Sequence, residues 1–327
     1  MCFHMCLLTT AQASYNFTSL RENQGIYFDK ISNMQIIRDE WKIFVYYDMD
    51  PYWQGITTCK KYPRSLGSLA ATNILRNLKN IQTPLLDTLT DIYHGRFNYH
   101  MLSPDQLKQQ LSLISSYLEK DVTLPINNFQ NDMKSIYHLL LVKGRMTEKY
   151  LIIELRIPLV TRDSFELFNT IPVPVSTNSS QFSIVPVSPY VAINLKKDSY
   201  YILSSEDITT CRHNGDEVLL CHMRKPETHL KSDEQFCVKN PKTNGCYFKV
   251  LDNCENSWTE LHVTNKYLYS CCTQCHVRLL CNEQVTSIQL KHAGVFTISH
   301  GCMLKTDTFS LHSEREKSSQ VYTKNNQ

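Results

Sequence analysis

The sequence contains few glycines, little excess of positive over negative charge and no long apolar run. Glycine occurs only 9 times in 327 residues and hydrophobic residues make up 42%, a composition that excludes collagen-like and disordered chains. The 34 basic residues nearly balance the 31 acidic ones, so we predict no nucleic-acid partner. No run of about 18 apolar residues occurs after the N-terminus, so we predict no membrane span in this chain.

Recognisable catalytic motifs are also missing. The chain contains no GxSxG, HExxH, P-loop or GxGxxG pattern. Cys59 and any of the 12 histidines could form a nucleophilic pair, but co-occurrence alone gives no geometry. His94, His100 and His138 lie near apolar segments and could sense mild acid, although a structural role is the default for histidine. We therefore predict neither an enzyme nor a cofactor.

Cysteine, in contrast, is concentrated in one segment. Ten of the 13 cysteines fall between Cys211 and Cys302, which indicates either a disulfide framework in an oxidising compartment or metal sites. Cys272 and Cys275 form one CxxC with His276 beside it, but no second CxxC follows at zinc-site spacing. We therefore predict disulfides and no metal. The candidate cysteines are Cys59, Cys211, Cys221, Cys237, Cys246, Cys254, Cys271, Cys272, Cys275, Cys281 and Cys302.

Two further consequences follow from this cysteine pattern. The adjacent Cys271 and Cys272 must bond to two different partners. A thiol-dependent catalyst built on the CxxC would need a thioredoxin-like βαβ setting, which the surrounding sequence lacks.

The N-terminal sequence and two sequons favour the secretory pathway. Residues 1–13 are a possible truncated signal peptide, with a short apolar stretch and Ala11-Gln12-Ala13 as a small-x-small cleavage pattern, but no basic n-region. Asn16 and Asn178 each begin an N-x-[ST] glycosylation sequon. The predicted location is therefore luminal or extracellular.

Periodicity predicts both strands and helices. Trp41, Ile43, Val45, Tyr47 and Met49 alternate with polar or aromatic residues, which is typical of a strand with one buried face, and Pro51 should end it.

The helical signals follow this strand. Thr83 and Pro84 predict a helix with Thr83 as N-cap that ends near Gly95. Ser103-Pro104-Asp105-Gln106 is a capping box that predicts a second helix with Leu107, Leu111, Ile114 and Leu118 on its apolar face.

The second half of the chain is predicted to be mainly β. Residues 136–142 and 150–160 indicate a hairpin with its turn around Lys143-Gly144-Arg145. The prolines of residues 162–195 predict edge strands or extended crossings, because proline removes a ladder donor. The predicted segments are a β segment 14–62, a helical segment with a shortened heptad region 63–122, a β-rich domain 123–205, a cysteine-rich β domain 206–304 and a polar tail 305–327.

These segments together resemble a known family. GIYFDKISNMQIIRDEWKIFVYYDMDPYW (residues 25–53), LSPDQLKQQL (102–111), YLIIELRIPLV (150–160), FELFNTIPVPV (165–175), SPYVAINLKKDSYYILSSEDITTC (188–211) and GVFTISHGC (294–302) occur in the same order as in baculovirus F-type envelope fusion proteins and the envelope proteins of insect errantiviruses (gypsy-type elements). The resemblance covers about residues 25–302.

The resemblance implies an α+β, β-rich and disulfide-rich head of a class I viral fusion glycoprotein with a few helices. In this family a furin-like protease cuts a precursor, and a fusion peptide, a trimeric coiled coil and a C-terminal anchor follow. Only about forty residues stand between Trp53 and Ile92, where the cut, the fusion peptide and most of the coil belong, and the second heptad segment and the anchor are not found after Cys302. Arg64 is a degenerate cleavage-site candidate, because Lys61 replaces the outer arginine and Pro63 precedes the scissile residue.

Two functions remain open from the sequence. The first is an endogenous envelope-like protein, a fusion-defective remnant or a partial gene model, whose partners would be a cell-surface receptor or an intact envelope protein, with a possible homotrimer. The alternative is a secreted disulfide-rich binding module unrelated to viral entry.

Overall fold

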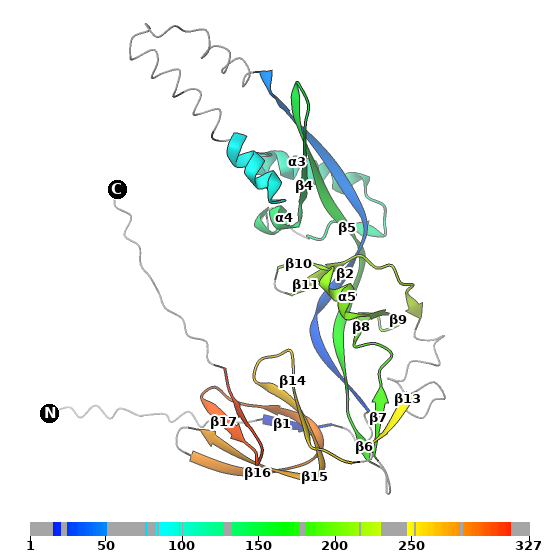
Figure 1. Ribbon diagram of the computed structural model, residues 1–327. Coiled ribbons are helices and arrows are strands. Elements are labelled where there is room, and N and C mark those ends of the chain that lie inside the picture. Colours follow the sequence, from blue (N-terminus) through cyan, green and yellow to red (C-terminus); the bar gives the residue numbers. More distant parts are fainter. Residues whose placement is uncertain are drawn as a thin grey trace, which may run out of the picture. The chain divides into compact units, whose positions relative to one another are not determined.

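The computed structural model has a β-rich α+β fold (Figure 1), as predicted. It describes residues 16–20, 25–50, 76, 83, 85–97, 99, 101–126, 133–176, 181–215, 217–229, 247–251, 253–281 and 284–314. The possible signal peptide 1–13 lies outside these residues. The chain divides into two compact units. Unit 1 combines residues up to Ile31, Phe168–Val191 and residues from Thr228 onward, and unit 2 combines Ser32–Leu167 and Ala192–Glu227. The units thus cut across the contiguous segments predicted above.

Two strands of 23 residues each form the centre of unit 2. These are β2 (Ile26–Asp48) and β5 (Tyr150–Pro172), which are neighbours in the strand order β10-β11-β2-β5-β8-β9. Two short strands, β3 and β4, pair with β5 as well. The shorter strands of this sheet are β3 (Val122–Thr123), β4 (Leu141–Met146), β8 (Tyr190–Asn194), β9 (Ser199–Leu203), β10 (Arg212–Asn214) and β11 (Val218–Cys221). β12 (Thr228–His229), which follows β9 in the order, consists of unit 1 residues.

The predicted alternation in β2 is confirmed. Ile43 and Met49 are buried, whereas Phe44 and Tyr46 on the opposite face are exposed. Trp41, Val45 and Tyr47 are partly buried against the same core as Ile43. One face of the sheet therefore carries the core of unit 2, as expected for a period of two.

Helices cover that inner face. The capping box predicted at Ser103 is present: α3 (Pro104–Tyr117) begins with Ser103 accepting from the Gln106 N–H, and the Gln106 side chain accepts from the Ser103 N–H. Leu107, Leu111 and Ile114 are buried against β5 residues such as Ile153. The other helices are α4 (Met133–Leu139) and α5 (Ser205–Thr209).

The helix before α3 ends where the sequence predicted. Residues 85–93 are helical, and Gly95 has a φ of 67°. The Arg96 N–H donates to the Asp91 carbonyl and the Gly95 N–H donates to the Ile92 carbonyl, the two bonds of a Schellman cap. The predicted start is wrong, because Thr83 is itself helical and is not the N-cap.

The predicted hairpin exists, but its turn is displaced. Residues 133–139 form α4, so the first predicted strand begins only at Leu141. The chain reverses at Thr147, whose N–H donates to the Tyr150 carbonyl at 2.8 Å. Gly144 lies inside β4, opposite Ile153, and a Cβ there would come within 2.8 Å of Ile92. The glycine therefore permits a close approach of the helix and is not a turn residue.

Unit 1 contains a sheet in the order β1-β16-β15-β17-β18, with β14 also paired to β15. A separate small sheet has the order β13-β7-β6. The bounds are β1 (Asn16–Ser19), β6 (Val175–Ser176), β7 (Gln181–Val185), β13 (Tyr247–Leu251), β14 (Ser257–Glu260), β15 (Lys266–Cys281), β16 (Gln284–Thr297), β17 (Cys302–Lys305) and β18 (Ser310–His312).

The prolines lie at strand ends more than in edge strands. Pro172 is the last residue of β5, Pro186 directly follows β7, and Pro189 directly precedes β8. A proline at a strand end costs no interior ladder bond. β5 lies inside its sheet although it also contains Pro158 in its interior, whereas the sequence predicted edge strands or extended crossings for residues 162–195.

Aromatic side chains fill the core of unit 1. Tyr269 and Phe296 are almost fully buried, and Trp258 lies against both, with ring centroids 5.5 and 6.2 Å away. Gly294, paired opposite Tyr269, leaves the space that the Tyr269 ring occupies, because a Cβ there would lie 2.5 Å from the Tyr269 hydroxyl oxygen.

We expect Gly294→Ala to destabilise unit 1. The new methyl group would also lie 2.6 Å from the Thr18 carbonyl oxygen, and a backbone atom of β1 cannot retreat without breaking its pairing with β16. Overpacking of this kind costs about 1–3 kcal/mol. Urea denaturation followed by tryptophan fluorescence measures the loss. Ser287→Ala, at an exposed position of the same strand, is the control, and equal midpoints for both variants would contradict the prediction.

Disulfide framework and candidate functional surfaces

The part of the chain that the structure describes contains four disulfides. Cys211–Cys221 lies in unit 2, and Cys254–Cys272, Cys271–Cys275 and Cys281–Cys302 lie in unit 1. The adjacent Cys271 and Cys272 have different partners. Cys59, Cys237 and Cys246 lie outside the described residues, as do Asn178, Arg64 and His100.

The strand register explains two of these bonds. Cys281 and Cys302 are directly opposite each other in β15 and β17, with 4.4 Å between their Cα atoms. The pairing of β15 with β16 shifts register between Ser270 and Gln274, and Cys271–Cys275 closes across that irregularity. Such a shift inserts extra residues on one strand and bends it. The disulfide therefore fixes the bend of β15.

The remaining unit 1 disulfide attaches a surface segment to β15. Cys254 is exposed and Cys272 is half-buried, and the Cys272 N–H donates to the Asn256 side-chain oxygen at 2.9 Å. Since Cys272 and Cys275 each bond to a different cysteine, the CxxC offers no thiol pair. Among the described residues, no group of three or more His, Cys, Asp or Glu side chains is arranged to hold a metal ion.

Asn16, the described glycosylation candidate, is the first residue of β1. Its side chain is exposed, and β1 is an edge strand paired only with β16 in this sheet. The predicted acid-sensing residues His94 and His138 are also exposed.

The outer face of the sheet in unit 2 carries a network of charged side chains. Glu40 of β2 accepts from Arg212 at 2.9 Å and lies 3.6 Å from Arg156 of β5. Arg156 in turn donates to Glu154 at 2.6 Å and lowers the pKa of that carboxyl. These four side chains are each only 20–25% exposed. The alternation of β2 predicted this face, but the ion pairs of Glu40 with Arg156 of β5 and Arg212 of β10 could not be read from the sequence.

Exposed aromatic side chains continue the same face. Phe44 and Tyr46 are 50% and 61% exposed, and the Tyr46 ring meets the Tyr150 ring edge to face at 6.2 Å. The Lys149 ammonium lies 5.4 Å from the centre of the Tyr150 ring. Aromatic side chains and arginine are enriched at protein interfaces.

A second polar cluster surrounds α5. Ser204 and Asp207 form a capping box, and Lys225 donates to the Asp207 carboxylate at 2.6 Å. These bonds, that from Lys225 first, lower the pKa of Asp207 to about 2. Tyr201 donates to Glu227 at 3.2 Å, and burial together with this carboxylate raises the pKa of Tyr201 to about 12.

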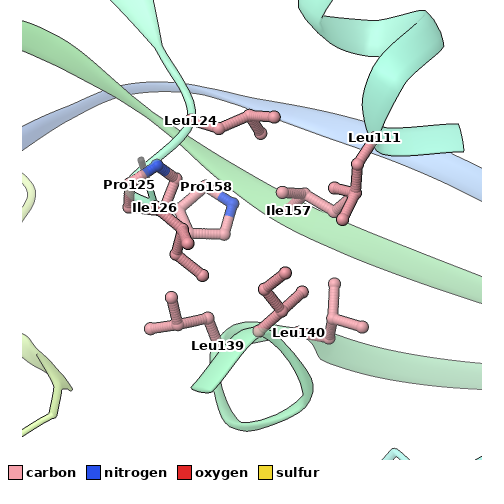
Figure 2. Close-up of a pocket in the computed structure, with 9 residues that line it drawn as sticks. Leu111, Leu124, Pro125, Ile126, Leu139, Leu140, Ile157 and Pro158 are labelled. Carbon is pink, nitrogen blue, oxygen red and sulfur yellow. The ribbon is translucent and has the colours of Figure 1, made fainter. Parts of the chain in front are cut away.

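One pocket of unit 2 is too small for a ligand. It encloses only about 10 Å³, far below the roughly 300 Å³ of the smallest typical ligand sites. Figure 2 shows Leu111, Leu139, Leu140 and Ile157 around it, and every lining side chain is apolar. The pocket is therefore a packing gap between α3, α4 and β5.

Comparison with known proteins identifies the family. The model of the family described as "Baculovirus F protein" matches residues 54–327. The chain belongs to the baculovirus F protein family. It is also 23% identical over 192 residues to the envelope fusion protein of Lymantria dispar multicapsid nuclear polyhedrosis virus, which covers 57% of this chain and 27% of that protein. The chain thus spans well under two thirds of the length of this relative.

Membership of the F protein family confirms the resemblance found in the sequence. The family comprises envelope fusion glycoproteins, which are secretory-pathway proteins and not enzymes. Within the described residues, no helix is long and apolar enough to cross a membrane.

For this F-family chain we expect Asp207→Asn to remove a pH-dependent part of the stability. The pKa of Asp207 is depressed in the folded state, so its contribution is present above the unfolded pKa near 4 and is lost as pH falls toward about 2. The ion pair is partly exposed, so the loss at neutral pH should stay below about 1 kcal/mol. Urea midpoints of both proteins from pH 7 to pH 2 measure it. Glu206→Gln, on the same helix, is the charge control, and an Asp207→Asn difference that is independent of pH would refute the assignment.

We further expect the unit 1 disulfides to open in a fixed order. Cys254 is exposed, whereas Cys271 and Cys275 are 5% and 6% exposed, and reduction depends on access to sulfur. Limited phosphine reduction followed by alkylation and peptide mass spectrometry should label Cys254 and Cys272 first. Cys281–Cys302 is the buried reference, and earlier labelling of Cys271 and Cys275 would contradict the order.

Proposed function

We propose that this chain is an envelope-derived extracellular glycoprotein that binds a partner at the cell surface and does not drive membrane fusion on its own. The partner is either a cell-surface receptor or an intact envelope fusion protein. We further propose that Asn16 and Asn178 are glycosylated and that the chain forms a homotrimer. Its ancestral structure would be the head of a class I fusion protein.

The short connection between β2 and α3 is the observation that carries this proposal. β2 ends at Asp48 and α3 begins at Pro104. In a class I fusion protein this interval holds the protease cut, the fusion peptide and a long coiled coil. Only the 55 residues from Met49 to Ser103 stand in this interval, too few for a cleavage site, a fusion peptide and a long coiled coil together. The shortness of the interval supports a binding role over a fusion role.

The retained parts support binding. β2, β5 and the disulfide-bonded strands of unit 1 form sheets with buried cores. Phe44, Tyr46 and Tyr150 provide an aromatic surface beside the charged network. The alternative of a secreted module unrelated to viral entry loses its basis, because the chain belongs to the F protein family.

Cell-binding and cell-fusion assays test the proposal together. Purified protein secreted from insect cells should bind to the surface of those cells by flow cytometry. Cells that display the chain through an added anchor should form no syncytia at pH 7 or pH 5, whereas the Lymantria dispar virus envelope fusion protein serves as the fusion-competent control. Syncytia formed by the chain alone would overturn the fusion-defective part of the proposal.

The partner is tested by co-expression. Immunoprecipitation of the chain with a tagged intact envelope protein should recover a complex if the partner is an envelope protein. Replacing Phe44 and Tyr46 by serine should weaken whichever interaction uses the aromatic surface, and Val285→Ser, exposed on unit 1, is the matched control. Absence of both cell binding and complex formation would contradict the proposed function.

A further inference from the structure

The outer face of strands β15–β18 in the unit 1 sheet carries only basic and neutral side chains. The strands β15, β16, β17 and β18 contain no aspartate or glutamate, and Figure 1 shows β15, β16 and β17 next to one another. We call the outward side chains of these strands the basic face. Its basic members are His276, Arg278, Lys291, Lys305 and His312.

The strand register places these residues on one side of the sheet. Along β15 the exposed His276 and Arg278 alternate with Val277 and Leu279, which are buried in the core. Residues that are directly opposite in an antiparallel pair point to the same face. Lys291 is opposite Gln274, Arg278 is opposite Lys305, and His312 is opposite Met303. The five basic residues therefore share the outer face.

The opposition of Arg278 and Lys305 is unfavourable in the free protein. Two like charges directly across a strand pair destabilise a sheet, and no described acidic side chain forms a salt bridge with either residue. Asp307 lies two residues beyond Lys305, in the turn between β17 and β18 and outside the ladder. A bound anion would remove the repulsion that the acidic side chains of the described residues leave uncompensated.

The neutral neighbours of these cations identify the class of anion. Gln274, Gln289 and Ser287 are exposed between the charged residues. The Gln289 amide donates to the Gln274 side-chain oxygen, and the Gln274 amide, the Gln289 side-chain oxygen and the Ser287 hydroxyl can form hydrogen bonds to sugar hydroxyls. Binding to a membrane surface would require a large apolar face beside the cations, but Val285, at the end of the ladder, is the one large hydrophobic side chain of β15–β18 that is more than half exposed among the described residues.

We propose that the basic face binds a sulfated polysaccharide of the cell surface. This inference rests on the proposed cell-surface binding function and names the chemistry of one ligand. The sulfate groups would lie over Arg278, Lys305 and Lys291 and the sugar hydroxyls over the glutamines. Attachment through such a polymer needs no fusion machinery, because it depends only on charge and on exposed polar groups.

Immobilised heparin is the probe. The full chain should be retained at about 0.15 M salt, and the double variant Arg278→Gln, Lys305→Gln should elute at lower salt. Because each neutralised charge releases about one counterion, the slope of log affinity against log salt should fall by about two. The same variant should unfold at an equal or higher temperature than the parent, since it loses a repulsion. A lower unfolding temperature would contradict the charge argument.

Arg145→Gln with Lys249→Gln is the matched control. It removes one arginine and one lysine that are exposed on β4 and β13, outside the basic face, and it should leave the salt slope nearly unchanged. Equal weakening by both double variants would show a net-charge effect and overturn the proposal. So would binding to vesicles that contain phosphatidylserine, with no retention on heparin.

Cell binding separates this inference from the proposed function. If the basic face acts as proposed, heparinase treatment of the cells should reduce binding of the parent protein to the level of the Arg278→Gln, Lys305→Gln variant. Undiminished binding to treated cells would reject the polysaccharide ligand and leave the proposed binding function standing. Loss of binding to all cells, with heparin retention intact, would reject the function and leave the basic face as a polyanion site.

Discussion

The pairing of β2 with β5 is the constraint on which unit 2 depends. Both strands are far longer than the five or six residues of an average strand, and they are separated by about one hundred residues of sequence. Their inner face receives α3, α4 and the helix at residues 85–93. Because a shift of one residue would exchange the inner and outer faces, this register decides both what is buried and which side chains face solvent.

The outward side chains of this sheet gain their arrangement from the same pairing. Glu40 and Arg156 meet only because their strands are neighbours, and Arg212 reaches Glu40 from β10. Buried or half-buried charges need partners with good geometry. The network therefore favours one register of the sheet. It borders the aromatic surface of Phe44 and Tyr46, whose exposed side chains do not contribute to the core.

Unit 1 uses covalent bonds where its chain is irregular. β15 runs for 16 residues through a register shift, and two disulfides lie at this shift while a third joins β15 to β17. Disulfides restrict the unfolded chain and so favour the folded one. With its bend fixed, β15 holds Cys271, Cys275 and Cys281 in the core together with its tyrosines, and His276 and Arg278 on the opposite face.

The sequence by itself determined the local elements and the family. The capping box at Ser103, the glycine that ends the helix at Gly95 and the alternation of β2 depend on contacts between near neighbours, and the ordered series of family segments identified the F proteins. Tertiary structure decided the rest. The local pattern at Gly144 predicts a turn, but this glycine allows a helix to approach a strand. Residues 136–139 are helical although their apolar run predicts a strand. The partners of each cysteine and the opposition of Arg278 and Lys305 depend on strand register between distant segments, which no local pattern encodes.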